Sequence, residues 1–145
     1  MLKKLSLGGY LCALAAVLGL AGAVLTIASG FVSADNPLSN LPVIAAAVFA
    51  GAVLSALPIV TSTRFGNFDL IGSASIIAAI ALYCYAFGAA VSQRVMLIAG
   101  LFSFNSGNAA GWNVFYVSVG AWACLLVGCL MLIVSGFLRS AKENA

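Results

Sequence analysis

Histidine is absent from this sequence of 145 residues, and charged residues are scarce. Lysine and arginine number six and aspartate and glutamate three, so charged residues make up 6% of the chain, against about 25% in soluble domains. The lack of histidine excludes a His-ligated haem or zinc site and any catalytic arrangement built on a histidine base. Hydrophobic residues make up 64% of the chain. The composition therefore indicates an integral membrane protein rather than an ordinary water-soluble enzyme.

Long apolar runs free of charge explain this composition. They cover about residues 7–31, 41–60, 70–91 and 114–138, and each reaches the roughly 20 residues that a helix needs to cross a bilayer. Because backbone polar groups in hydrocarbon must be satisfied within the segment, such runs form helices. The sequence predicts an all-α integral membrane protein, a compact four-transmembrane-helix bundle that forms a single domain over residues 1–145.

The first apolar run also has features of a secretory signal, because Lys3 and Lys4 precede it and Val32-Ser33-Ala34 resembles a small-residue cleavage site. The run is about 24 residues long, however, against roughly 7–15 in the apolar region of a signal peptide. We therefore expect it to be retained as the first transmembrane helix.

The positions of lysine and arginine predict the orientation. With the N-terminus inside, five of the six cations fall on the cytoplasmic side: Lys3, Lys4, Arg64, Arg139 and Lys142. This bias predicts that both termini are cytoplasmic and that the protein resides in the cell (plasma or inner) membrane. Arg94 is the outer cation, and we expect it to anchor the third helix at the lipid headgroups. The alternative role for Arg94 is to bind an anionic ligand.

Small residues recur at helical spacing on the predicted spans. The first helix carries Ala15, Gly19 and Ala23, and the fourth carries a stripe of small residues at the same interval: Gly120, Cys124 and Gly128. Small residues let transmembrane helices approach closely. In lipid the resulting van der Waals contact drives helix association, because the hydrophobic effect does not act there. The stripes predict either packing within one bundle or an interface with another protomer or partner.

Groups that perform chemistry are missing from the predicted spans. No charged residue interrupts them, and Asp69 stands just before the third helix, where we expect it to cap free N–H groups. The four cysteines fall within spans at what we expect to be different depths, so we interpret them as small packing residues. The sequence predicts no catalytic residue, no metal, no cofactor and no nucleic-acid partner.

The stretch between the third and fourth runs is irregular. Residues 95–104 are apolar but too short to span a membrane. We expect a short apolar segment in the outer loop, which forms a re-entrant turn, a lid or an extension of the third helix. An apolar segment outside the bilayer must be covered, so Phe102, Phe104 and Trp112 are further candidates for an interface.

Two functions fit this pattern. The first is a non-enzymatic structural or accessory subunit that acts by helix packing, as a homo-oligomer or with another membrane protein. The second is a small homo-oligomeric channel or carrier for a neutral or hydrophobic solute, lined by hydroxyl groups of the spans: Thr26, Ser55, Ser73, Ser75, Tyr83 and Tyr85. A pore requires these hydroxyls to converge on a hydrated cavity, whereas a packing subunit allows them to bond backbone carbonyls.

Overall fold

The computed structural model describes residues 5–33, 35–65 and 69–138, and these residues form helices joined by short connections. The described part of the chain is all-helical, as the sequence predicted. The predicted orientation rests on five cations whose side chains are not among those described: Lys3, Lys4, Arg64, Arg139 and Lys142.

The helices are α1 (Leu7–Phe31), α2 (Leu41–Phe65), α3 (Leu70–Ser103) and α4 (Ala109–Gly136). All four are long and apolar enough to cross a membrane, and they are the candidate spans found among the described residues. Their internal hydrogen bonds satisfy the backbone groups that lipid would leave without partners. The prediction of four transmembrane helices from the apolar runs is confirmed.

The third helix is much longer than the sequence predicted. It contains 34 residues and ends at Ser103, so the expected end at residue 91 is wrong. Of the three alternatives for the apolar segment, the extension of the third helix is the one observed for residues 95–103, and no proline interrupts this stretch. At 1.5 Å per residue α3 is about 51 Å long, whereas the hydrocarbon core is about 30 Å thick. The excess length carries one end of α3 beyond the core.

Two local features set the other helix ends. Asp69 caps α3 as predicted, since its carboxylate accepts a hydrogen bond from the backbone N–H of Gly72 at 2.9 Å. Asn108 caps α4 in the same way by accepting from the N–H of Gly111 at 2.9 Å, so α4 begins five residues before the expected position. Helix α2 continues through Pro58 to Phe65.

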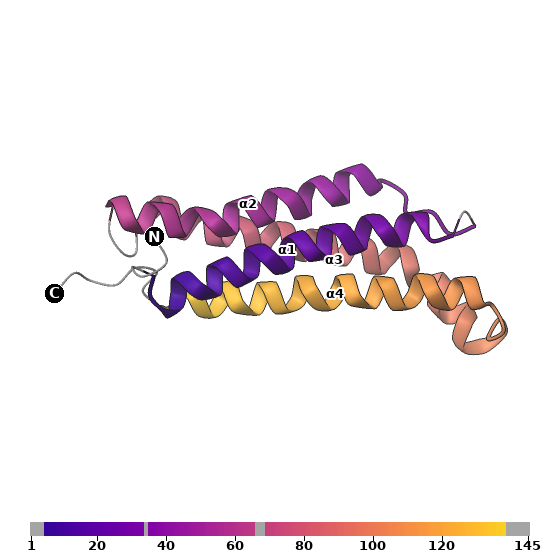
Figure 1. Ribbon diagram of the computed structural model, residues 1–145. Helices are drawn as coiled ribbons and strands as arrows, with labels where there is room; N and C mark the ends of the chain where they lie inside the picture. Colours follow the sequence, from indigo (N-terminus) through magenta and orange to yellow (C-terminus); the bar gives the residue numbers. More distant parts are fainter. Residues whose placement is uncertain (1–4, 34, 66–68, 139–145) are drawn as a thin grey trace.

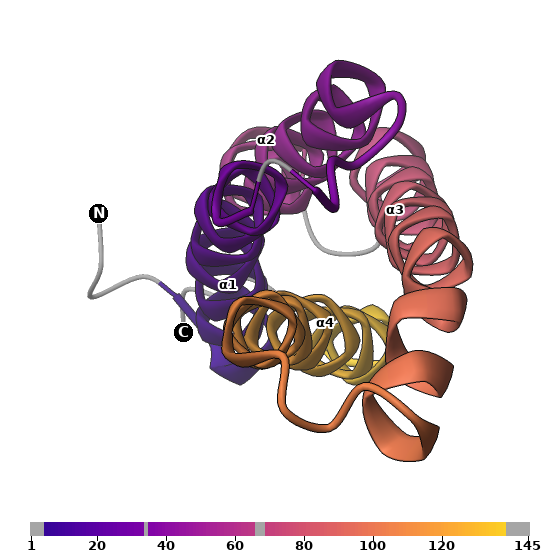
Figure 2. The same ribbon diagram turned by 90° about the vertical axis from the view of Figure 1, so that its right-hand side faces the viewer.

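The helices form an antiparallel bundle in which each packs against two neighbours. Helix α1 contacts α2 and α4, and α3 contacts the same two helices from the opposite side. Figure 2, which looks along the bundle, shows this order, with α1 and α3 on one diagonal. Helix α1 begins and α4 ends at the same end of the molecule (Figure 1). We call this the terminal end, and the opposite end, where α3 passes into α4, the far end.

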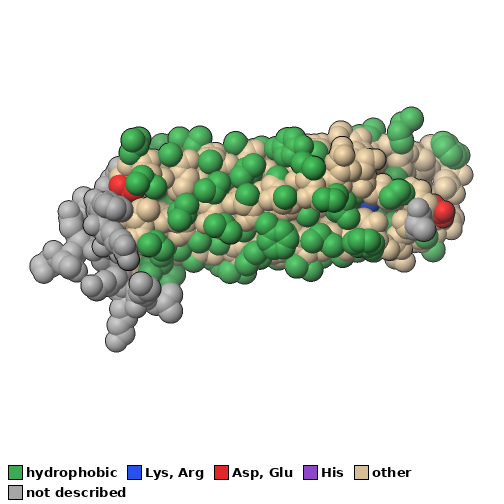
Figure 3. Space-filling model, turned by 90° about the horizontal axis from the view of Figure 1, so that it is seen from above, with side chains coloured by type: hydrophobic (Ala, Val, Ile, Leu, Met, Phe, Trp, Pro, Cys, Tyr) green, Lys and Arg blue, Asp and Glu red, His purple; other side chains and the backbone are tan. Residues whose placement is uncertain are grey.

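Small residues make up much of the interior of the bundle, beside a few large ones such as Tyr83 and Leu125, and many large apolar residues lie outside. Ala15, Ala23, Ala79 and Ala86 are fully buried, whereas large side chains on every helix are exposed, among them Val17, Val53, Ile77 and Leu130. Figure 3 shows one face covered largely by hydrophobic side chains, with acidic groups only near the two ends. This inversion of the soluble pattern is expected when lipid is the solvent, because apolar side chains gain nothing by leaving it.

Candidate functional site

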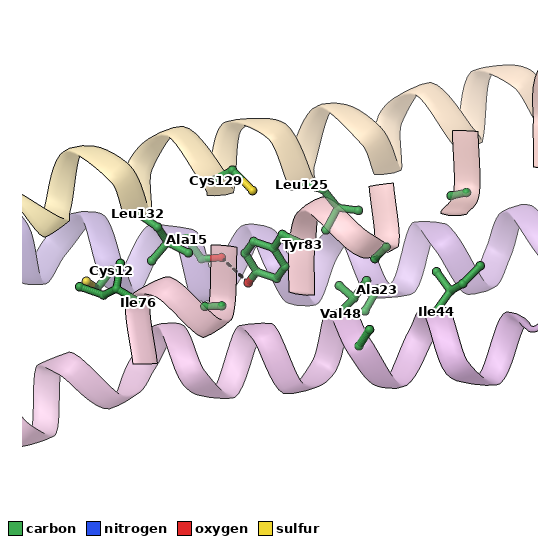
Figure 4. Packing of buried hydrophobic residues seen from close by; sticks show 14 of the residues in the cluster. Cys12, Ala15, Ala23, Ile44, Val48, Ile76, Tyr83, Leu125, Cys129 and Leu132 are labelled. Atoms are coloured by element: carbon green, nitrogen blue, oxygen red, sulfur yellow. Dashed lines mark hydrogen bonds between the residues drawn. The ribbon is translucent and has the colours of Figure 1, made fainter. Parts of the chain in front are cut away.

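The centre of the bundle is occupied by one tyrosine. Tyr83 on α3 is fully buried, and its hydroxyl donates a hydrogen bond across the diagonal to the carbonyl oxygen of Ala15 on α1, at 3.1 Å. Figure 4 shows the ring lying between the helices with its hydroxyl directed at that carbonyl. Gly19, the midpoint of α1, also faces the ring. Tyr83 therefore fills the middle of the bundle.

Each of the other three helices presents a glycine to this ring. A Cβ atom at Gly19 of α1 would overlap the tyrosine hydroxyl oxygen, and one at Gly51 of α2 would lie 2.7 Å from Cε1. At Gly128 of α4 a Cβ would lie 3.3 Å from Cε2. We call Tyr83 with Gly19, Gly51 and Gly128 the glycine niche. An aromatic ring fits the centre because these three helices carry no side chain at that level.

Tyr83 lies deeper in the bundle than the predicted end of the third span, residue 91, implied. Since α3 continues to Ser103, Tyr83 lies well inside the helix rather than near its end. The glycines at positions 19, 51 and 128 were visible in the sequence, but the ring that they accommodate was not.

The buried hydroxyls of the predicted pore lining bond to backbone carbonyls. Thr26 donates to the carbonyl of Gly22 at 2.7 Å, Ser55 to Ala52 at 2.8 Å and Ser75 to Gly72 at 2.8 Å. In each case donor and acceptor belong to the same helix. The remaining members of the list, Ser73 and Tyr85, are exposed on the outside of the bundle. The described hydroxyls do not converge on a shared cavity.

Arg94 is buried within the far half of the bundle. Its side chain is 3% exposed, and its two terminal nitrogens donate to the carbonyl oxygens of Ser29, at 2.8 Å, and Asn36, at 2.6 Å. Ser29 lies in the last turn of α1, whose carbonyls lack helical partners and carry partial negative charge. The expectation of a surface anchor at the headgroups is therefore wrong, as is the expectation of spans without ionisable groups. Arg94 ties α3 to the end of α1.

Other polar atoms near this end are unsatisfied. Among the described residues, three buried atoms have no hydrogen-bond partner: Gln93 Oε1, Arg94 Nε and Ser118 Oγ. Ser118 lies on α4 two residues before Gly120, which faces Leu25 of α1. Since the helices are antiparallel, Ser118 is within one turn of the level of Ser29. Among the described residues, the far half of the bundle thus contains buried polar atoms without a partner, whereas the buried hydroxyls of Ser55 and Tyr83 at the centre have partners.

The small-residue stripes of α1 and α4 contact neighbours inside the bundle. A Cβ at Gly120 would lie 3.5 Å from Leu25, and one at Gly22 would lie 3.5 Å from the Cβ of Cys124. Gly128 faces Tyr83, and Ala15 and Ala23 are fully buried. All six predicted small interface residues thus have neighbours within their own chain.

The three aromatic candidates are differently placed. Phe102 and Phe104 are 67% and 88% exposed, and the half-buried Trp112 donates its indole N–H to the carbonyl of Ser106 at 2.8 Å. Phe102 makes edge-to-face contacts with Trp112 at 5.1 Å and with Phe115 at 5.8 Å between ring centroids, and Trp112 stacks on Tyr116. We call these residues the aromatic end: Phe102, Phe104, Trp112, Phe115 and Tyr116. It is a rigid group of rings on the surface where α3 meets α4.

Two of the four cysteines are closer than expected. The sulfur atoms of Cys84 on α3 and Cys129 on α4 lie 3.9 Å apart, so the expectation of different depths is wrong for this pair. Among the described residues there is no group of three or more side chains that could hold a metal ion.

An open groove of about 470 Å³ runs between α2 and α3 near the terminal end. It is lined almost wholly by apolar side chains: Leu54, Leu57, Leu70, Ile71, Ala74, Ser75 and Ala78. Ser75 adds little polarity, because its hydroxyl bonds the carbonyl of Gly72. The groove lies on the outer surface, so its walls are suited to lipid chains.

Comparison with known proteins finds no family model, no curated protein and no solved structure that matches this chain. Its function must therefore be argued from its own residues.

Proposed function

We propose that this protein is a non-enzymatic, multi-pass membrane protein that acts as a structural or accessory subunit, packing with copies of itself or with another membrane protein. The observation that carries the proposal is the use of the interior polar groups. Ser55, Ser75 and Tyr83 donate to backbone carbonyls, as a subunit that acts by helix packing allows. A bundle of this kind acts through its surface.

The surface that best fits a protein partner is the aromatic end. Large exposed aromatic rings are the residue type enriched in the centres of protein interfaces. Phe102 lies in the last turn of α3 and Phe104 is the residue that follows the helix, and the contact of Phe102 with Trp112 supports its position before binding. The small residues of α1 and α4 support this proposal less well, because they already have neighbours within their own chain.

The alternative, a channel or carrier for a neutral or hydrophobic solute, needs a hydrated path through the bundle or between copies of it. Tyr83 fills the centre of the bundle, and the hydroxyls of Thr26, Ser55 and Ser75 bond carbonyls of their own helices. These contacts favour packing over transport through a single chain. A pore between protomers would be lined by the outer surface, which is strongly apolar.

For location we propose the cell membrane with both termini in the cytoplasm. The support is the bias of lysine and arginine in the sequence, five of six on one side. Reporter fusions at the two termini test this orientation. Signal from both reporters on the cytoplasmic side is the expected result, and a terminus on the outer side contradicts it.

The experiment that tests the function is the mass of the particle extracted from its native membrane in a mild detergent. We expect a particle that contains more than one protein chain, because the aromatic end is covered in the assembly. The double variant Phe102→Ala/Phe104→Ala should release the single chain. Phe31→Ala is the matched control, since Phe31 is also an exposed aromatic residue, 77% exposed, but not part of the aromatic end.

Three results would overturn the proposal. One is a wild-type particle of a single chain, and another is an assembly that survives the double variant unchanged. The third is solute flux through purified protein in liposomes, which would favour the transport function.

A further inference from the structure

Two thiols meet near the middle of the bundle, on neighbouring helices. Cys84 on α3 and Cys129 on α4 have sulfur atoms 3.9 Å apart, although 45 residues separate them in the chain. Cys84 directly follows Tyr83 and Cys129 directly follows Gly128, so both lie at the level of the glycine niche. Cys129 is buried, whereas Cys84 is exposed on the outer surface.

The pair is placed for a covalent bond between the helices. A disulfide bond is about 2.05 Å long, so the two sulfur atoms must approach by about 1.9 Å from their present separation. Rotation about the Cα–Cβ bonds moves each sulfur without moving the backbone. The other cysteines have different neighbours, since Cys12 contacts the hydroxyl of Ser135 at 3.4 Å and Cys124 lies near Gly22 of α1.

The surroundings of the pair determine which reagents reach it. At the level of Tyr83 the surface of the bundle is expected to face hydrocarbon, and glutathione and thioredoxin, which keep thiols reduced in the cytosol, are soluble in water. A lipid-soluble oxidant, by contrast, concentrates in the bilayer and meets the exposed thiol of Cys84.

We propose that Cys84 and Cys129 form an oxidisable pair that a lipid-soluble two-electron oxidant of the quinone class converts to a disulfide joining α3 to α4 inside the membrane. Two S–H bonds break and one S–S bond forms. The two thiols release two electrons and two protons, and the quinone accepts both to become a quinol. The product is a covalent link between helices that the reduced protein holds together by packing alone.

The bridge has a direct structural consequence. Helices α3 and α4 are joined through the short connection between Ser103 and Ala109 at the far end, and a bond between Cys84 and Cys129 would join them a second time near the middle. Because a cross-link of this kind removes conformational freedom from the unfolded chain, the oxidised protein should unfold at a higher temperature than the reduced one.

The test counts thiols in full-length protein after membranes are treated with a fully substituted quinone, which cannot add to thiols. The protein is then denatured, alkylated and weighed. The variant Cys12→Ala/Cys124→Ala retains only the proposed pair. We expect it to lose both alkylatable thiols and the mass of two hydrogen atoms while remaining a single chain.

The matched control is Cys84→Ala/Cys129→Ala, which retains the other two cysteines and should keep both thiols after the same treatment. The proposal is overturned if the first variant keeps its thiols, if the control loses its thiols equally, or if oxidation links two chains through Cys84. Circular dichroism before oxidation verifies that each variant is folded.

Discussion

The centre and the far end of this bundle are held together by different kinds of interaction. At the centre, a single aromatic ring sits against three glycines, and its hydroxyl is satisfied by one carbonyl. At the far end, the charged side chain of Arg94 bonds one carbonyl in the last turn of α1 and one in the connection that follows, and three buried polar atoms have no partner among the described residues. The centre depends on shape, and the far end on hydrogen bonds.

This difference follows from depth in the membrane. Arg94 is eleven residues beyond Tyr83, which places it about 16 Å further along the helix axis. If Tyr83 lies near the bilayer midplane, as its contact with the midpoint of α1 indicates, Arg94 lies at the edge of the roughly 30 Å core. Water can hydrogen-bond unpartnered polar groups at that edge but not at the centre, so polar groups without a protein partner are tolerated only at the edge.

The largest effect should come from emptying the centre. Tyr83→Ala leaves a cavity bounded by glycines, which have no side chains to fill it, and should destabilise the protein by about 3–5 kcal/mol. Tyr85→Ala, which truncates an exposed tyrosine two residues away, is the control and should lower the free energy of unfolding far less. Reversible unfolding in mixed detergent micelles measures both. Equal losses would show that the ring at position 83 has no special role.

The next largest effect should come from overfilling the niche. Gly19→Ala places a methyl group against the hydroxyl of Tyr83 and should cost about 1–3 kcal/mol. Gly88→Ala is the matched control, because a Cβ there meets nothing within 4 Å and alanine favours the helix by up to about 1 kcal/mol. The same unfolding measurement should therefore show opposite signs for the two variants, and the account is wrong if both stabilise.

A smaller and more local effect is expected at the far end. Arg94→Met removes the hydrogen bonds to Ser29 and Asn36 and should cost about 1 kcal/mol, since hydration at the core edge replaces part of the loss. Hydrogen exchange should quicken at the end of α1 and in the following loop while remaining slow around Tyr83. Faster exchange throughout the bundle would contradict the separation of the two regions.

Sequence patterns predicted where the helices lie better than they predicted which residues contact one another. The apolar runs located all four helices, and the position of Asp69 before an apolar run predicted its capping role. The predicted end of the third span, before Arg94, was wrong because a charged residue was taken to mark the end of a span. The helix continues past it, since the guanidinium finds carbonyl partners on another element, and these partners are 58 and 65 residues away in the chain.

The candidate site shows the same limit. The glycines at positions 19, 51 and 128 signalled close packing, but sequence spacing relates residues within one helix and says nothing of which ring lies opposite. Tyr83 and the Cys84–Cys129 contact depend on how α3 is aligned with its neighbours. The predicted end at residue 91 implied a different alignment of α3, and for that reason both features were missed.

The central claim, that Tyr83 fits its niche through the absence of a side chain at Gly19, is tested most directly by a double-mutant cycle. Unfolding free energies are measured for Gly19→Ala, Tyr83→Phe and the two combined. Removal of the hydroxyl takes away the nearest overlap with the alanine methyl and leaves Cζ of the ring, 2.7 Å from that position, as the remaining close contact. The account predicts that the double variant loses clearly less stability than the sum of the two single losses. Strictly additive losses would contradict it.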